Sequence, residues 1–174
     1  LNGAGILSGS VISSNTSLII EDGFKLIDCD VCAINVTSGT FTMNGGEITN
    51  ISREGHIINI AGGTAIFNGG SIYNNECVDM SGTFYCIYVE AGTLNIPSNS
   101  TALIYKNYSS ISAGEYDTEK GAFIYNKNGT VTILGSNLAQ GTCYEEPINS
   151  GGSGTVTGTP VSDFSTLKTN INSA

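Results

Sequence analysis

A ten-residue phrase occurs twice in this chain, and it constrains the fold more than any other feature. Residues 39–48 read GTFTMNGGEI and residues 63–72 read GTAIFNGGSI. Weaker copies of the phrase begin at Gly92 and Gly129. A short strand and a glycine turn that recur at intervals of about 20 residues or more are typical of a solenoid, in which each repeat buries its apolar face against the next.

The threonine of each Gly-Thr pair marks the phase of a coil, and Ser17 serves as an earlier marker. The markers are Ser17, Thr40, Thr64, Thr93 and Thr130, and the intervals between them are 23, 24, 29 and 37 residues. The intervals grow while the strand after each marker keeps its length. This pattern indicates insertions at the turns, which a parallel β-helix tolerates.

Apolar residues keep a constant distance from the markers. The residues one and three positions after each marker are apolar, and those between them are mixed, which is the period-2 alternation of a strand with one buried face. Isoleucine stands six positions before each of four markers: Ile34, Ile58, Ile87 and Ile124. The column four positions before the markers is interrupted by Asn126. A β-sandwich of short strands is the alternative, but it gives no reason for one phrase to repeat in phase.

The predicted fold is therefore all-β: a single-stranded, right-handed parallel β-helix of about five coils over residues 1–148. Residues 149–158 read as a Gly/Ser-rich linker or a degenerate coil. Residues 159–174 would form a cap on the last coil or an inter-subunit arm, with a short helix as one form. An apolar stripe suited to assembly lies in this tail: Phe164, Leu167 and Ile171.

Stacked asparagines are expected at the corners of the coils. Asn44 and Asn68 hold equivalent turn positions, as do Asn50 and Asn74. Side-chain amides in such columns can bond to one another along the axis and satisfy backbone groups of the corner.

Charge and composition limit the partners. The formal net charge is −9 with only six Lys and Arg residues, which argues against nucleic acid and against an anionic membrane surface. No apolar run approaches the roughly 18 residues of a membrane span, so no membrane insertion is expected. The first residue is Leu1, as in a processed chain or a piece excised from a longer one.

Sequons and cysteines favour a place outside the cell or on its surface. Six asparagines stand in N-x-[ST] acceptors for N-glycans: Asn15, Asn35, Asn50, Asn99, Asn107 and Asn128. We expect Asn15, Asn99, Asn107 and Asn128 to be better acceptors than Asn50, because the Asn50 side chain belongs to a corner ladder. Cys77 and Cys86 flank an insertion and are the expected disulfide. The pairing of Cys29, Cys32 and Cys143 stays open, and no zinc is expected at the lone C-x-x-C of residues 29–32.

Two tetrapeptides carry a resemblance. Residues 41–44 fit F-x-x-N, and residues 62–66, GGTAI, come near G-G-A-[ILV]. Over residues 17–140 the chain resembles the repeats of polymorphic outer-membrane proteins and related pectin-lyase-like surface proteins. The resemblance implies a right-handed β-helix on a cell surface that works in adhesion or as structure.

No catalytic, cofactor or metal residues are expected. Asp28 and Asp30 share a parity but read as a solvated turn, Arg53 has no partner in phase, and His56 has the parity of an inward core residue. Outward Tyr88 and Tyr125 stand in one column and could form a platform for a sugar. Two T-x-T pairs, at residues 40–42 and 130–132, resemble those of ice-binding solenoids.

The resulting hypothesis is an extracellular structural or adhesive β-helix that associates with itself end to end, because each open end of a solenoid exposes unpaired strand groups. Its other partners would be glycans or cell-surface ligands. The alternatives are a carbohydrate-binding or polysaccharide-processing β-helix and an ice-binding solenoid.

Overall fold

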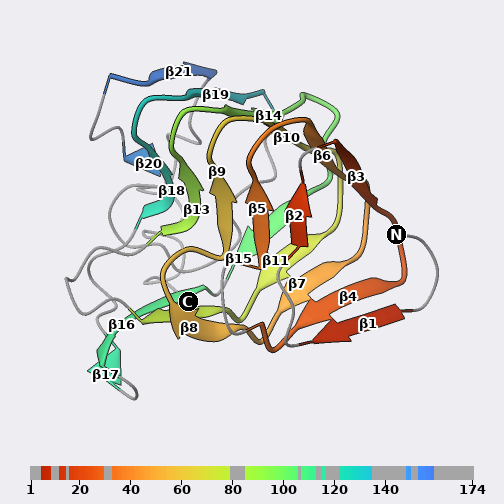
Figure 1. The fold of residues 1–174 in the computed structure, drawn as a ribbon, viewed down its shortest axis with the longest axis vertical. Coiled ribbons are helices and arrows are strands. Elements are labelled where there is room, and N and C mark those ends of the chain that lie inside the picture. The colour runs from red at the N-terminus through yellow and green to blue at the C-terminus, as the bar shows by residue number, and fades with distance from the viewer. Residues whose placement is uncertain are drawn as a thin grey trace, which may run out of the picture.

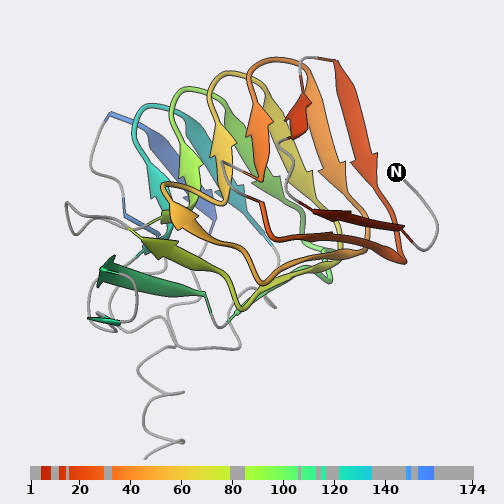
Figure 2. The same cartoon turned by 60° about the horizontal axis from the view of Figure 1, so that its bottom comes forward.

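The computed structural model describes residues 5–8, 12–14, 16–29, 33–78, 85–105, 107–112, 115–116, 122–134, 148–149 and 153–158. Every regular element within these ranges is a strand, and nearly all pairings are parallel. The coils follow one another from the red N-terminal strands to the blue strand β21, and equivalent strands of successive coils lie side by side (Figures 1 and 2). The predicted all-β parallel solenoid is therefore confirmed.

The strands that begin at the hydroxyl markers form one face, which we call the threonine sheet. Its order is β21-β19-β14-β10-β6-β3. Its strands are β3 (Ser17–Ile20), β6 (Thr40–Met43), β10 (Thr64–Phe67), β14 (Thr93–Ile96), β19 (Thr130–Ile133) and β21 (Thr155–Gly158). The markers are direct register partners from Ser17 to Thr130, and Thr155 continues the column. Residues 155–158 thus add a further row to the solenoid.

The second face, the isoleucine sheet, has the order β2-β5-β9-β13-β18-β20. Its strands are β2 (Ile12–Ser14), β5 (Ile34–Val36), β9 (Ile58–Ile60), β13 (Tyr85–Val89), β18 (Ala122–Asn126) and β20 (Ile148–Asn149). The predicted isoleucine column is confirmed as a run of register partners. Ile12 and Ile148 extend it at either end.

Two further sheets complete the cross-section. The third sheet has the order β1-β4-β7-β11-β15, with β1 (Gly5–Ser8), β4 (Phe24–Ile27), β7 (Glu47–Thr49), β11 (Ser71–Tyr73) and β15 (Leu103–Tyr105). The fourth sheet contains β8 (Ser52–Glu54), β12 (Glu76–Val78), β16 (Tyr108–Ser112) and β17 (Glu115–Tyr116). Its strands β8, β12 and β16 pair in parallel from coil to coil, and its β16–β17 pair is antiparallel.

Glycine recurs before each marker because the coils approach most closely there. A Cβ on Gly63 would lie 2.7 Å from the carbonyl oxygen of Gly39. Gly92 meets the carbonyl oxygen of Gly63 in the same way, and Gly129 that of Gly92. Any side chain at these positions would collide with backbone of the preceding coil, so the repeated phrase is a packing requirement.

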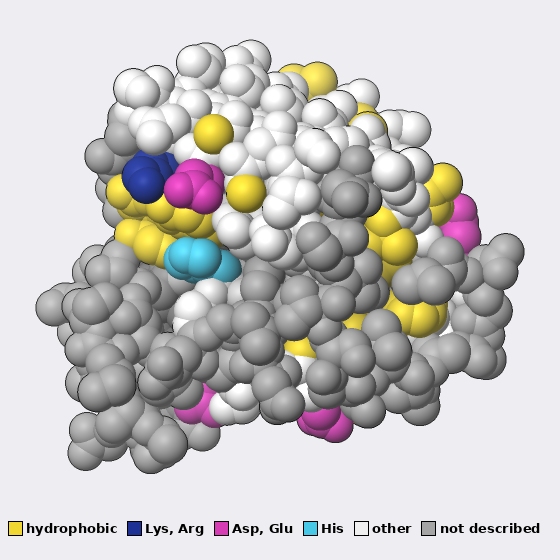
Figure 3. Space-filling view, in the orientation of Figure 1, with side chains coloured by type: hydrophobic (Ala, Val, Ile, Leu, Met, Phe, Trp, Pro, Cys, Tyr) yellow, Lys and Arg dark blue, Asp and Glu magenta, His cyan; other side chains and the backbone are white. Residues whose placement is uncertain are grey.

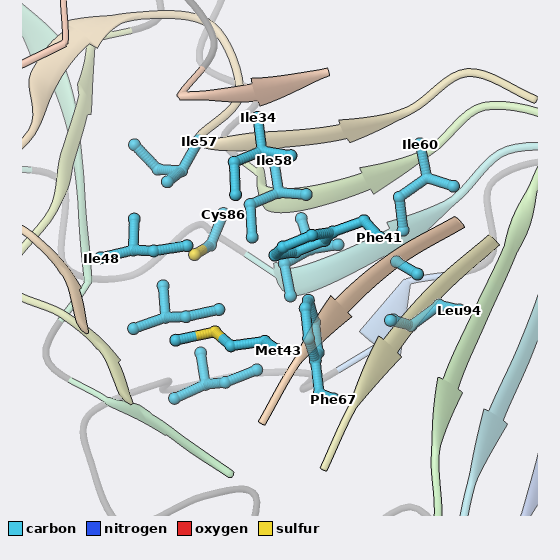
Figure 4. Packing of buried hydrophobic residues seen from close by; sticks show 14 of the residues in the cluster. Ile34, Phe41, Met43, Ile48, Ile57, Ile58, Ile60, Phe67, Cys86 and Leu94 are labelled. Atoms are coloured by element: carbon cyan, nitrogen blue, oxygen red, sulfur yellow. The ribbon is translucent and has the colours of Figure 1, made fainter. Parts of the chain in front are cut away.

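The interior is apolar and continuous through the coils (Figure 4). Phe41 and Phe67 pack edge to face with ring centroids 5.9 Å apart. Ile58 and Ile87 are fully buried, as the sequence predicts. The alternation fails just before them, because Ile57 and Cys86 are buried as well.

Amide ladders cross the coils at the corners. The Asn44–Asn68 ladder is confirmed by an amide–amide bond of 2.8 Å. Asn50 and Asn74 are equivalent as predicted, and both have left-handed backbone, with φ of 55° and 54°. The interior ladder of that corner lies one residue later, where Asn75 Nδ2 donates to Asn107 Oδ1 at 2.8 Å.

Asn126 fills a core position without breaking the coil. It is fully buried; its Oδ1 accepts from the Gly129 N–H at 2.9 Å and its Nδ2 donates to the carbonyl oxygens of Gly129 and Thr155. The amide therefore binds the turn before the threonine sheet to the next coil.

In the described part of the chain, no helix has the length and hydropathy that a bilayer crossing requires.

Candidate functional site: an aromatic cluster on the isoleucine sheet

Four aromatic side chains gather on the outer face of the isoleucine sheet, across three coils. Tyr88 of β13 and Tyr125 of β18 are register partners, and their rings stack with centroids 5.6 Å apart and an interplanar angle of 9°. His56 stacks on Tyr88 at 4.2 Å and 6°, and Tyr85 lies 4.1 Å from Tyr125 at 36°. We call these four residues the aromatic cluster.

The sequence missed half of this cluster. It placed His56 inward, with the same parity as Tyr85, and that prediction is wrong because His56 stacks on the outward Tyr88. The reason is the pair of consecutive buried residues in each coil, Ile57 with Ile58 and Cys86 with Ile87. Two adjacent inward side chains reverse the alternation before them. The adjacent apolar residues in both coils were the available signal.

Ring orientation defines what the cluster offers to a ligand. Parallel rings at 4.2 Å cover one another's faces. All four side chains are half-buried, so the cluster is partly open to solvent. It therefore differs from a platform of coplanar rings.

A charged pair borders the cluster on the turn after the sheet. Lys127 Nζ lies 3.7 Å from a Glu90 carboxylate oxygen, with both side chains well exposed. A hydrogen bond with Tyr88 is the largest cause that raises the pKa of Lys127, and Tyr88 and Glu90 add electrostatic attraction. Figure 3 shows basic and acidic side chains beside an apolar patch, with the chain's one histidine at its border.

A second aromatic pair lies on a different face. Tyr73 and Tyr105 stack across β11 and β15 with centroids 5.1 Å apart and an angle of 4°. The Tyr73 hydroxyl donates to Glu47 at 2.7 Å, and Lys25 Nζ lies 2.9 Å from the same carboxylate. We call Lys25, Glu47, Tyr73 and Tyr105 the ladder of the third sheet; they come from four successive coils and contact one another. Because this ladder also stacks two tyrosines, it is a matched comparison for the aromatic cluster.

The predicted sequons differ sharply in their surroundings. Asn50, Asn99 and Asn128 are exposed at corners. Asn107 is 8% exposed and its Nδ2 donates to the Ile72 carbonyl at 3.1 Å, so a glycan on that nitrogen does not fit the folded chain.

The remaining two sequons give no such contrast. Asn35 is half-buried, and its Oδ1 accepts from Asn59. Asn15 lies outside the described residues.

The cysteine predictions remain predictions. Cys86 is buried in β13, and Cys77 belongs to β12, but the side chain of Cys77 lies outside the described residues. Cys29 is buried and its thiol donates to the Ile27 carbonyl at 3.6 Å. Cys32 and Cys143 lie outside the described residues.

The residues weighed for catalysis are not brought together by the described structure. Asp28 is exposed with a φ of 50°, Asp30 lies outside the described residues, and Arg53 belongs to β8. Among the described residues, no three His, Cys, Asp or Glu side chains are grouped as a metal site would require. The tail residues Phe164, Leu167 and Ile171 also lie outside the described part.

Comparison with known proteins adds no relative. No protein-family model, no curated protein and no solved structure matches the chain.

Proposed function

We propose that this chain is an extracellular structural β-helix that works as an adhesive module and contacts its partner through the aromatic cluster. The observation that carries the proposal is the gathering of His56, Tyr85, Tyr88 and Tyr125 on one outer face. Contiguous aromatic surface of this kind on a soluble scaffold is typical of an interaction site.

The arrangement has the anatomy of a binding surface. Tyrosine is enriched where interfaces concentrate their binding energy, because it combines a large apolar area with a hydrogen-bonding hydroxyl. The three tyrosine rings are held by the paired strands β13 and β18, and His56 stands just before β9, so little conformational entropy is lost on binding. Lys127 and Glu90 form a polar border beside the rings.

Glycans are the ligand class that we assign to this surface. The outer faces of the peripheral rings can pack against the C–H face of a pyranose, while Lys127 and Glu90 can hydrogen-bond its hydroxyl groups. The low charge of the chain, at 12% charged residues, suits recognition by hydroxyl and ring contacts.

The test is a binding measurement with two matched variants. Tyr88→Ser removes the ring that contacts the three others, and Tyr105→Ser removes one ring of the stacked pair on the third sheet. Binding to a glycan array and to cell surfaces is measured for both, with circular dichroism to verify the fold. We expect Tyr88→Ser to lose roughly tenfold or more in affinity, the size of a central interface tyrosine, and Tyr105→Ser to bind as the parent does. Equal binding by all three proteins would remove the aromatic cluster from the proposal.

Self-association end to end is a separate proposal with its own test. Stacked solenoids would pair the strand groups that open ends expose. Negative-stain electron microscopy of the full chain and of a chain lacking residues 159–174 should show filaments for the first and single particles for the second. Single particles in both samples would contradict self-association, and only the proposal of an adhesive module would remain.

A further inference from the structure

The outer face of the threonine sheet presents two columns of uncharged side chains. The first column consists of Ser17, Thr40, Thr64, Thr93, Thr130 and Thr155. The second, two residues further along each strand, consists of Ile19, Thr42, Ile66, Asn95, Thr132 and Thr157. The sequence shows two T-x-T pairs, whereas the structure adds a third from β21 and makes the first column hydroxyl-bearing throughout.

These columns face solvent. The residues between them, such as Phe41, Leu94 and Val131, are fully buried. The column residues themselves are exposed or half-buried, and Ile19 is 42% exposed. The face is therefore an open surface on the opposite side of these strands from the core.

The register makes this surface a regular grid. No shift interrupts the pairing over six strands. Neighbouring strands are about 4.8 Å apart, and alternate residues of one strand about 6.6 Å apart. Threonine has few χ1 rotamers because it is branched at Cβ. In the first column, five threonines from Thr40 to Thr155 therefore repeat methyl and hydroxyl groups at the strand spacing over about 19 Å along the axis. The second column is less regular, because it holds threonine at three of its six positions.

We propose that this grid binds ice. Threonine methyl groups restrict the water around them, and the threonine hydroxyl groups can hydrogen-bond ordered waters. A layer of water held at the fixed repeat of the first column can continue into the oxygen lattice of the solid. The ligand is thus crystalline water, and the binding surface is the threonine sheet.

Charge supports this ligand over ionic ones. None of the positions in the two columns carries a charged side chain, although the chain as a whole has a net charge of −9. A charged group would hold a hydration shell of its own that does not fit a neutral lattice. The neutral face therefore complements a neutral solid surface.

This inference is independent of the aromatic cluster, which lies on another face, and either proposal can fail alone. The experiment measures thermal hysteresis, ice-crystal shaping and inhibition of ice recrystallisation. The parent chain is compared with Thr64→Lys, in the middle of the grid. Ser71→Lys serves as the matched control, because Ser71 is a half-buried strand residue of the third sheet.

We expect the parent and Ser71→Lys to shape ice and to show a hysteresis gap, and Thr64→Lys to lose most of that gap while keeping its circular dichroism spectrum. Thr42→Val, which keeps the shape of a grid residue but removes its hydroxyl, provides a second variant if Thr64→Lys fails to fold, and a reduced gap is expected. Absence of ice shaping by the folded parent overturns the proposal. If neither protein shapes ice, two other results also overturn the proposal. One is a parent dimer that the substitution Thr64→Lys dissociates, and the other is binding to insoluble polysaccharide that Thr64→Lys abolishes.

Discussion

Asn75 and Asn107 join two coils inside the solenoid through an amide–amide hydrogen bond of 2.8 Å. Both side chains are buried, and each also serves the backbone of the corner. Asn75 Nδ2 donates to the Ile48 carbonyl, and Asn75 Oδ1 accepts from the Ile51 N–H. A corner that would otherwise bury unpaired backbone groups is thereby satisfied.

Replacing Asn75 should therefore be costly. Asn75→Ala leaves the Ile51 N–H and the Ile48 carbonyl without the amide that binds them, and each such group costs about 1–3 kcal/mol. We expect the free energy of unfolding to fall by roughly 2–6 kcal/mol in urea titrations. Asn68→Ala is the control, because the Asn44–Asn68 bond is exposed and water can replace it. A similar loss in both variants would contradict the role of the interior ladder.

Glycan attachment should follow burial. In protein from its native source, we expect modified Asn99 and Asn128, which are exposed at corners, and unmodified Asn107. Attachment at Asn107 would remove a hydrogen on the nitrogen that donates to Ile72 and would insert a sugar into the core. Glycopeptide mass spectrometry of the folded protein decides the matter. Full occupancy at Asn107 is the outcome that this structure does not permit.

The isoleucine column should dominate stability. Ile58 is fully buried in register with Ile87, so Ile58→Ala should cost about 2–5 kcal/mol through lost burial and a cavity. Asn59→Ala removes one half-buried amide bond to Asn35 and should cost about 1 kcal/mol. Thermal and urea unfolding of the two variants provide the comparison. Equal losses would mean that inward and outward positions of β9 have been interchanged.

The ladder of the third sheet predicts that part of the free energy of unfolding depends on pH in the acid range. Hydrogen bonds from Lys25 and then Tyr73 lower the pKa of Glu47 below its ordinary 4.5. A lowered carboxyl pKa adds stability above the ordinary value, and this stability is lost as the pH falls through the lowered one. Parent and Glu47→Gln should differ slightly at neutral pH and converge well below 4.5, with the difference reduced by salt because the groups are exposed. If the difference in unfolding free energy between the parent and Glu47→Gln grew as the pH fell, the predicted pH dependence would be wrong.

The expected disulfide is open to a direct chemical test. Non-reducing peptide mapping should yield one peptide pair linked through Cys77 and Cys86. In the chain-entropy description, a loop of this length stabilises the fold by roughly 2.7 kcal/mol. Recovery of both residues as alkylated thiols from unreduced protein would exclude the bond.

Much of the fold could be predicted because the repeat leaves the register no freedom. A strand that slips by one residue turns its whole apolar set outward, so a phrase repeated in phase fixes which residues are partners. The order Thr40, Thr64, Thr93 and Thr130 is reproduced without error. The same logic failed at His56, where two adjacent inward residues reverse the parity.

By itself, then, the sequence determined the class of the fold, the register of its threonine and isoleucine sheets and the inward columns, since these follow from local alternation and from glycines that permit close approach. Only the tertiary structure decided which residues of the corners, and of the segments next to the insertions, become neighbours. The stacking of His56 on Tyr88, the ladder through Asn75 and Asn107 and the row added by β21 all join coils of unequal length. Their contacts depend on how each insertion folds between the repeated strands. A sequence pattern does not show how far apart in space an insertion leaves the residues on either side of it.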